Sequence, residues 1–248
     1  MAPALMESAV SPVPEGFLHA WRLEWSRALR RRRLFALNII VPLALVAPII
    51  AGQAPPQHAA LVFAILFVFF GTFGSAIPLL RDAERGMVRR LALLPVDPGR
   101  SLIGRVAAGA LIDATQLAPA CALIVLAGLP STNALWLALV LPATLAFASM
   151  LGLWVAAFAR SVAEGALFAA VSALLLAHAS GVFRTPRTGS AGASIENIAP
   201  FRAIHEVLLG APFAGVGTLL TAFAVSTLLT ALLGPHLMRS LARSDGRH

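Results

Sequence analysis

The sequence predicts an all-α integral membrane protein with six transmembrane helices. Of its 248 residues, 58% are hydrophobic and only 12% are charged, and the mean hydropathy is +0.83. A soluble domain usually has about 45–50% apolar and about 25% charged residues. The apolar runs are nearly continuous and lack the alternation of a transmembrane β-strand. Helices satisfy the backbone polar groups of such runs within lipid.

Six apolar runs have about the 20 residues that a helix needs to cross the bilayer core of roughly 30 Å. They lie at residues 34–52, 59–80, 106–129, 134–159, 163–183 and 212–237. A six-helix transmembrane domain is therefore expected over residues 34–237. A flexible tail at 1–15 and a helix at 16–33 precede it, and a cytoplasmic tail at 238–248 follows.

The helix at 16–33 is expected to be amphipathic. Trp21 and Trp25 fall on its apolar face, whereas Arg22 and Arg30 fall on the other. Aromatic side chains opposite arginines are typical of a helix that lies in the membrane interface. The alternative is an ordinary amphipathic helix of a soluble protein.

The distribution of arginine predicts the orientation. All 19 basic residues are arginine, and the net charge is +8. Arginines gather before the first run, between the second and third runs, and after the last run. Cytoplasmic loops carry such an excess of positive charge. We therefore expect a multi-pass protein of the cell (cytoplasmic) membrane with both termini in the cytoplasm. The positive charge is explained by loops that lie beside the lipid membrane, which is the expected partner. No nucleic-acid partner is expected.

The segment 81–100 between the second and third runs is charged and ends in a proline-bearing turn. Asp82 and Glu84 precede Arg89 and Arg90, an order that suits a helix dipole. It is read as a short cytosolic helix that docks into the groove of a partner. The alternative is a solvated loop whose arginines lie at the membrane surface. The candidate docking residues are Asp82, Glu84, Arg85, Gly86, Arg89, Leu91 and Pro95.

Glu84-Arg85-Gly86, followed by Leu91 and Pro95, resembles the segment between the second and third helices of type-2 ABC transporter permeases. Residues 160–165 and 180–183 resemble that family's fourth-to-fifth connection and the end of its fifth helix. The resemblance implies that 81–100 holds a coupling helix that contacts a separate ATP-binding cassette ATPase subunit. It also implies an exporter with a homodimer or pseudo-dimer of permeases and an alternating-access mechanism.

Two positions depart from the family pattern. Met87 stands where the family has threonine, and Arg89 replaces its second acid. A contact of reversed charge would require a compensating change on the ATPase. Arg89 and Arg90 could instead face lipid headgroups.

The chain is not expected to be an enzyme. It contains no lysine, and the phosphate-binding loop of an ATPase needs one. It also lacks a cytosolic stretch long enough for a nucleotide-binding domain. No catalytic residue, metal site or cofactor is predicted in this chain, so ATP and Mg²⁺ would be bound by the partner subunit.

Two polar residues fall inside the third apolar run. Asp113 and Gln116 are three positions apart and share a helix face. Polar groups in a bilayer are costly, which makes this pair a candidate substrate pathway. A buried, hydrogen-bonded structural acid is the alternative. His178 is expected to be an interfacial residue, and the single cysteine, Cys121, a small apolar side chain.

The segment 184–211 is expected outside the cell, as a flexible Gly- and Ser-rich stretch followed by a short helix from Pro200 to about Leu209. Within the spans, Gly71 with Ser75 and Ala148 with Gly152 have the spacing of closely packed helices.

Three other functions remain open. One is a permease similar to the haem exporter of cytochrome c maturation, because Asp82, Gly86 and residues 93–95 share its pattern. Another is a membrane enzyme that uses Asp113 and His178, and the third is a membrane scaffold without transport. For an exporter, the low charge of the spans favours an amphipathic cargo, drug-like or lipid-like, over a polar glycan.

Overall fold

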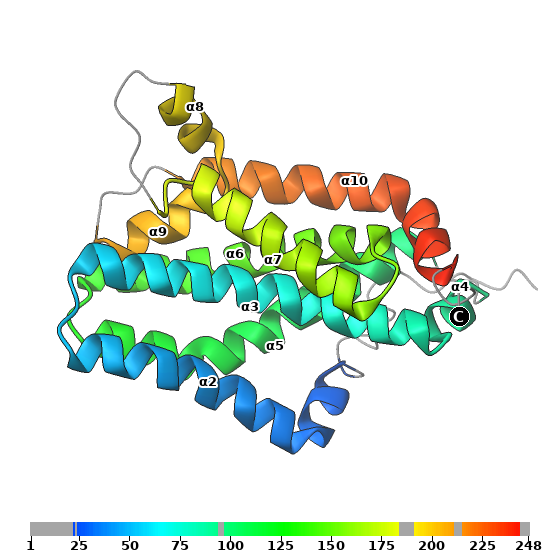
Figure 1. The fold of residues 1–248 in the computed structure, drawn as a ribbon, viewed down its shortest axis with the longest axis horizontal. Helices are drawn as coiled ribbons and strands as arrows, with labels where there is room; N and C mark the ends of the chain where they lie inside the picture. The colour runs from blue at the N-terminus through cyan, green and yellow to red at the C-terminus, as the bar shows by residue number, and fades with distance from the viewer. Residues whose placement is uncertain (1–21, 23, 94–96, 184–190, 211–214, 244–248) are drawn as a thin grey trace, which may run out of the picture.

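The computed structural model describes residues 22, 24–93, 97–183, 191–210 and 215–243. Within these residues, six helices are long and apolar enough to cross a membrane, and they form one bundle (Figure 1). The six-span fold is therefore confirmed. The spans are α2 (Arg32–Ala51), α3 (Pro56–Glu84), α5 (Pro98–Leu126), α6 (Ser131–Phe158), α7 (Val162–Ala179) and α10 (Val216–Arg243). The short helices are α4 (Met87–Ala92), α8 (Ala191–Ile198) and α9 (Arg202–Leu208).

Local sequence signals set the starts of two spans. The side chain of Asp97 accepts a hydrogen bond from the backbone N–H of Arg100 at 2.7 Å, and Pro98 opens α5. Ser161 caps α7 by accepting from the N–H of Glu164 at 3.2 Å. Such caps satisfy backbone donors that a helix leaves unpaired at its first turn.

α3 is the central helix of the bundle. It packs mainly against α6 and α7, and its buried face runs along most of its length, from Ala60 to Ala83. Most of α2 and α10, by contrast, remains exposed within this chain. These apolar surfaces suit contact with lipid or another membrane subunit.

Small residues bring α3 and α6 close together. A Cβ atom on Gly71 would lie 2.8 Å from that of Ala148, and a Cβ atom on Gly152 would collide with the carbonyl oxygen of Thr72. The hydroxyl of Ser149 donates to the carbonyl oxygen of Gly71 at 3.3 Å. The predicted close packing of these small residues is confirmed.

Several elements differ from their expected bounds, and α5 begins at Pro98, ahead of the apolar run at 106–129. α3 continues to Glu84, so Asp82 and Glu84 end a span instead of starting the short helix. α10 continues to Arg243, so part of the expected cytoplasmic tail is helical. A separate helix, α8, occupies part of the segment expected to be flexible. The Gly- and Ser-rich composition of that segment concealed the residues that form α8.

The ends of the bundle are distinct. The helical residues 24–30, α4 and the end of α10 lie toward one end, whereas α8 and α9 lie at the other (Figure 1). α9 is buried through Ile204 and Val207, and the side chain of Asn133 on α6 donates to the carbonyl oxygen of Val207 at 3.2 Å. Arg202 pairs with Glu206 at 2.5 Å on the same helix.

The α3–α6 contact predicts a sensitive position. Gly152→Ala should lower the free energy of unfolding by about 1–3 kcal/mol, because the added methyl group collides with backbone that cannot move aside cheaply. The midpoint of thermal unfolding in detergent measures this change. The control is Gly217→Ala on α10, where a Cβ atom meets nothing within 4 Å. Unfolding of both variants at the temperature of the parent would show that the α3–α6 contact tolerates the added methyl group.

Candidate functional site

The connection between α3 and α5 contains the predicted coupling segment. α3 ends at Glu84, Gly86 adopts φ = +68°, and α4 then occupies Met87–Ala92. Glycine takes this backbone conformation without the steric cost that a Cβ atom brings. The chain therefore turns sharply at Gly86 and separates α4 from the span.

The two acids of this segment contact the rest of the bundle. Asp82 forms an ion pair with Arg105 on α5. Glu84 accepts a hydrogen bond from the backbone N–H of Val162, the first residue of α7, at 3.0 Å. Both carboxylates therefore link the end of α3 to other spans.

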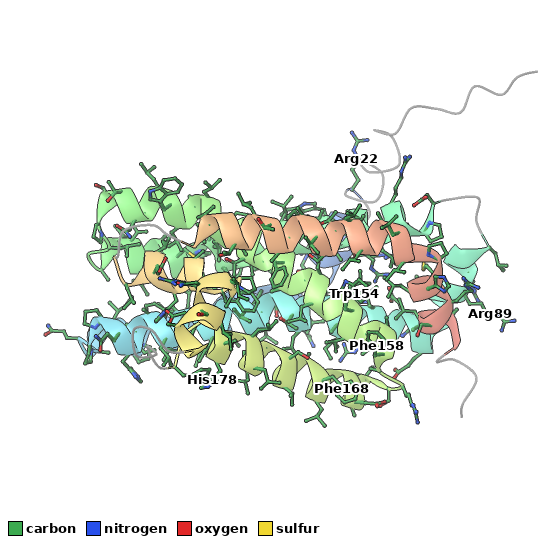
Figure 2. The ribbon with its side chains drawn as sticks, turned by 90° about the horizontal axis from the view of Figure 1, so that it is seen from above. Arg22, Arg89, Trp154, Phe158, Phe168 and His178 are labelled. Atoms are coloured by element: carbon green, nitrogen blue, oxygen red, sulfur yellow. The ribbon has the colours of Figure 1, made fainter. Side chains whose placement is uncertain are left out.

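The basic residues of the segment are exposed instead. Arg85, Arg89 and Arg90 are exposed, and Arg89 points away from the bundle at its end (Figure 2). Val88 on α4 is buried with Leu237 and Leu241 of α10. α4 thus has one face held by the bundle and an outer basic surface. The side chain of Leu91 and all of Pro95 lie outside the described residues.

Arg105 joins three elements at this end. Besides Asp82, its guanidinium lies 3.7 Å from Glu24, which also pairs with Arg27 at 3.1 Å. The helical residues 24–30 are thereby tied to α3 and α5. Glu24 and Arg105 were not predicted as site residues. Their only signal was a charged residue beside an apolar run, which many membrane proteins have.

The predicted interface helix is described only in part. Residues 24–30 are helical, Trp25 is partly buried, and Arg22 and Arg30 are exposed. Figure 2 shows Arg22 directed away from the bundle. Trp21 lies outside the described residues.

A cavity of about 510 Å³ lies between the helical residues 24–30, α2, α3 and α5. We call it the inner cavity. Its walls are charged near the α3–α5 connection, where two acids and five arginines line it. Deeper in, the walls carry Phe35, Phe70 and Phe73, together with Asp113 and Gln116. The two predicted pathway residues therefore line one cavity.

The polar groups at the deep end are unequally satisfied. The side chain of Asn38 on α2 donates to Oε1 of Gln116 at 3.1 Å. Asp113 is 7% exposed, and its Oδ2 atom has no hydrogen-bond partner among the described residues. A Cβ atom on Gly74 would lie 2.5 Å from that oxygen. Asn38 and Gly74 were missed by the sequence analysis, since each contributes only in combination with a residue on another helix.

The histidines lie elsewhere. His178 is near the end of α7, with its ring centroid 6.1 Å from that of Phe183, and it does not line the inner cavity. Figure 2 places it away from the end that carries Arg89. Burial lowers the pKa of His205 on α9, and the nearby charge of Glu206 opposes this effect. Within the described part of the chain, no three His, Cys, Asp or Glu residues are grouped to hold a metal ion.

The sequence model of the ABC-2 type transporter family matches residues 15–213, a range that includes the inner cavity, α4 and α9. No curated protein matched the chain. A match over this much of the sequence, together with six apolar helices in one bundle, establishes the family. The chain therefore belongs to the ABC-2 type transporter family, as a membrane-spanning permease.

Proposed function

We propose that this permease forms the translocation path of an ATP-driven exporter and that a separate ATPase subunit docks on α4. The observation that carries the proposal is the position of α4. Its outer surface presents Arg89 and Arg90, and Leu93 just beyond it is 81% exposed. An exposed basic and apolar surface of this kind suits a protein groove.

Contacts around α4 supply a route for motion. Val88 holds α4 against α10, Asp82 ties the end of α3 to α5, and Glu84 ties it to the first turn of α7. A push on α4 would therefore act on four spans together. ATP binding shifts the permease between two conformations only by as much as the free energy of ATP binding differs between them.

The assembly we propose has two permease copies, as a homodimer or pseudo-dimer, above two ATPase chains. ATP and Mg²⁺ are bound by those partner chains, since this one has no lysine for a phosphate-binding loop. The membrane is the cytoplasmic membrane, with α4 and both termini on the cytoplasmic side. The cargo is amphipathic, which suits a cavity with a charged mouth and aromatic walls.

The chain alone should hydrolyse no ATP, whereas a complex with its co-purifying ATPase should.

In proteoliposomes, hydrophobic drugs or lipids should stimulate ATP hydrolysis by the complex more than polar oligosaccharides do. Phosphate release measures both effects. Robust hydrolysis by the pure lone chain contradicts the division of labour, and stimulation by oligosaccharides alone contradicts the cargo class.

Gly86→Pro should uncouple the permease while leaving it in the membrane. Proline fixes φ near −65°, opposite in sign to the +68° of Gly86. It also removes the N–H that donates to the carbonyl oxygen of Ala83 at 2.9 Å. A cost of about 3 kcal/mol to the start of α4 should lower cargo-stimulated ATPase activity.

The matched control is Gly128→Pro in the α5–α6 connection, where φ is +117° and the N–H donates to Val125 at 3.2 Å. It introduces a similar strain far from α4. Equal activity losses in the two variants would mean that strain alone, and not the turn before α4, explains the effect.

The orientation is tested by labelling single cysteines in a Cys121→Ala parent. Ser131 begins α6, and Ser240 lies in the last turns of α10; both are exposed. A membrane-impermeant thiol reagent should label Ser131→Cys in intact cells and Ser240→Cys only after permeabilisation. The reverse pattern would invert the proposed topology.

A further inference from the structure

Asp113 is a buried acid with one unpartnered oxygen in the part of the chain that the structure describes. It sits in the wall of the inner cavity with 7% of its surface exposed, and within the described chain nothing hydrogen-bonds to its Oδ2 atom. Arg105 on the same helix is occupied by Asp82 and Glu24 instead. Eight residues separate it from Asp113, about 12 Å along the axis. A buried polar group without a partner is costly, so a ligand that supplies one gains affinity.

The surrounding helices make room for this carboxylate. Gly74 on α3 faces it, and a Cβ atom there would lie 2.5 Å from Oδ2. Gly109 and Ser75, which also line this cavity, are small residues. Asp113 itself lines the cavity, so a molecule bound there would lie beside its carboxyl group.

The other walls favour an organic group. Phe35, Phe70 and Phe73 line the cavity, and Phe73 stacks on Phe69 with ring centroids 5.5 Å apart. Aromatic faces attract cations through their quadrupole, most strongly where water is excluded. The volume of about 510 Å³ lies within the range of roughly 300–1,000 Å³ that is typical of small-molecule pockets.

A small metal cation fits this environment poorly. Calcium takes about six to eight oxygen ligands, and magnesium needs a near-octahedral set with several waters. Asp113 is the single carboxylate at the deep end, and no metal-binding group of three acids, histidines or cysteines occurs in the described residues. An apolar cation requires no such coordination shell, because one carboxylate and aromatic faces satisfy it.

The arginines lie at the other end of the cavity. Arg27 and Arg105 pair with acids, whereas Arg31, Arg81 and Arg85 are exposed at the mouth. Arg81 is seven residues from Gly74, about 10 Å along α3. That distance is more than twice the roughly 4 Å of a direct ion pair, so the repulsion on a cation at Asp113 is weaker than the attraction of the adjacent carboxylate. An anion would be retained at the mouth and kept from the acid.

We propose that the inner cavity binds amphipathic organic cations, with the positive group at Asp113 and the apolar body against Phe35, Phe70 and Phe73. Only the identification of the bound molecule as cargo rests on the proposed export function. Asp113 is then the residue that selects the charge of the cargo, and Gly74 leaves room for the Asp113 carboxylate.

Binding can be measured on the lone chain in lipid nanodiscs, so the outcome does not depend on finding the ATPase. The probe is radiolabelled tetraphenylphosphonium in equilibrium dialysis, corrected for empty nanodiscs. Tetraphenylborate, nearly the same shape with opposite charge, controls for partition. We expect saturable binding of the cation and much weaker binding of the anion. Asp113→Asn should weaken cation binding about tenfold, whereas Asp113→Glu should keep most of it.

Two further variants keep the test valid if Asp113→Asn fails to fold, which size-exclusion chromatography and thermal unfolding would reveal. Gly74→Ala leaves the acid in place but crowds its oxygen, and it should weaken cation binding. Thr115→Val on the exposed face of α5 and Gly217→Ala on α10 should leave binding unchanged. Equal binding of the two probes, or unchanged cation binding in folded Asp113→Asn and Gly74→Ala, would overturn the proposal.

Discussion

The close approach of α3 to α6 is the contact on which the rest of the structure depends. Lipid offers no hydrophobic driving force between helices, so membrane helices associate through tight packing and hydrogen bonds. Gly71 and Gly152 allow this packing, and Ser149 adds a hydrogen bond across it. With α3 held at the centre, one of its faces is used for packing and another is left for the inner cavity.

α3 also connects that cavity to the end of the bundle. Gly74 stands beside Asp113, Arg81 lies at the mouth, and Asp82 and Glu84 tie the last turn to α5 and α7. A rigid helix transmits a displacement of its end along its axis. A rotation of α3 would therefore change both the mouth and the deep end of the cavity at once. This arrangement gives the proposed coupling a physical route that does not require a large movement of α4 itself.

Much of this fold could be predicted from local sequence patterns, whereas the inner cavity could not be predicted from them. Length and hydropathy are sufficient for six spans, and the spacing of Gly71, Ala148 and Gly152 indicated close packing. α3 and α10 continue past their apolar runs, to Glu84 and Arg243, which hydropathy alone does not specify. Asp113 and Gln116 were found because a polar residue in an apolar run is conspicuous. Asn38, Gly74 and the Glu24–Arg105–Asp82 cluster depend on helix pairs distant in sequence, which periodicity does not specify.

The placement of charge separates residues that support the fold from those available for function. At the α4 end, each acid of the α3–α5 region has a basic or backbone partner: Asp82 has Arg105, and Glu84 has the first N–H of α7. Such satisfied groups are expected in a structural network. Among the residues that the structure describes, Asp113 breaks this rule, since a residue type that costs free energy in a span has an unpaired Oδ2 atom beside a glycine. Local violations of folding rules occur mainly at functional or strained sites. We therefore expect the deep end of the inner cavity, more than its arginine-rich mouth, to select the cargo.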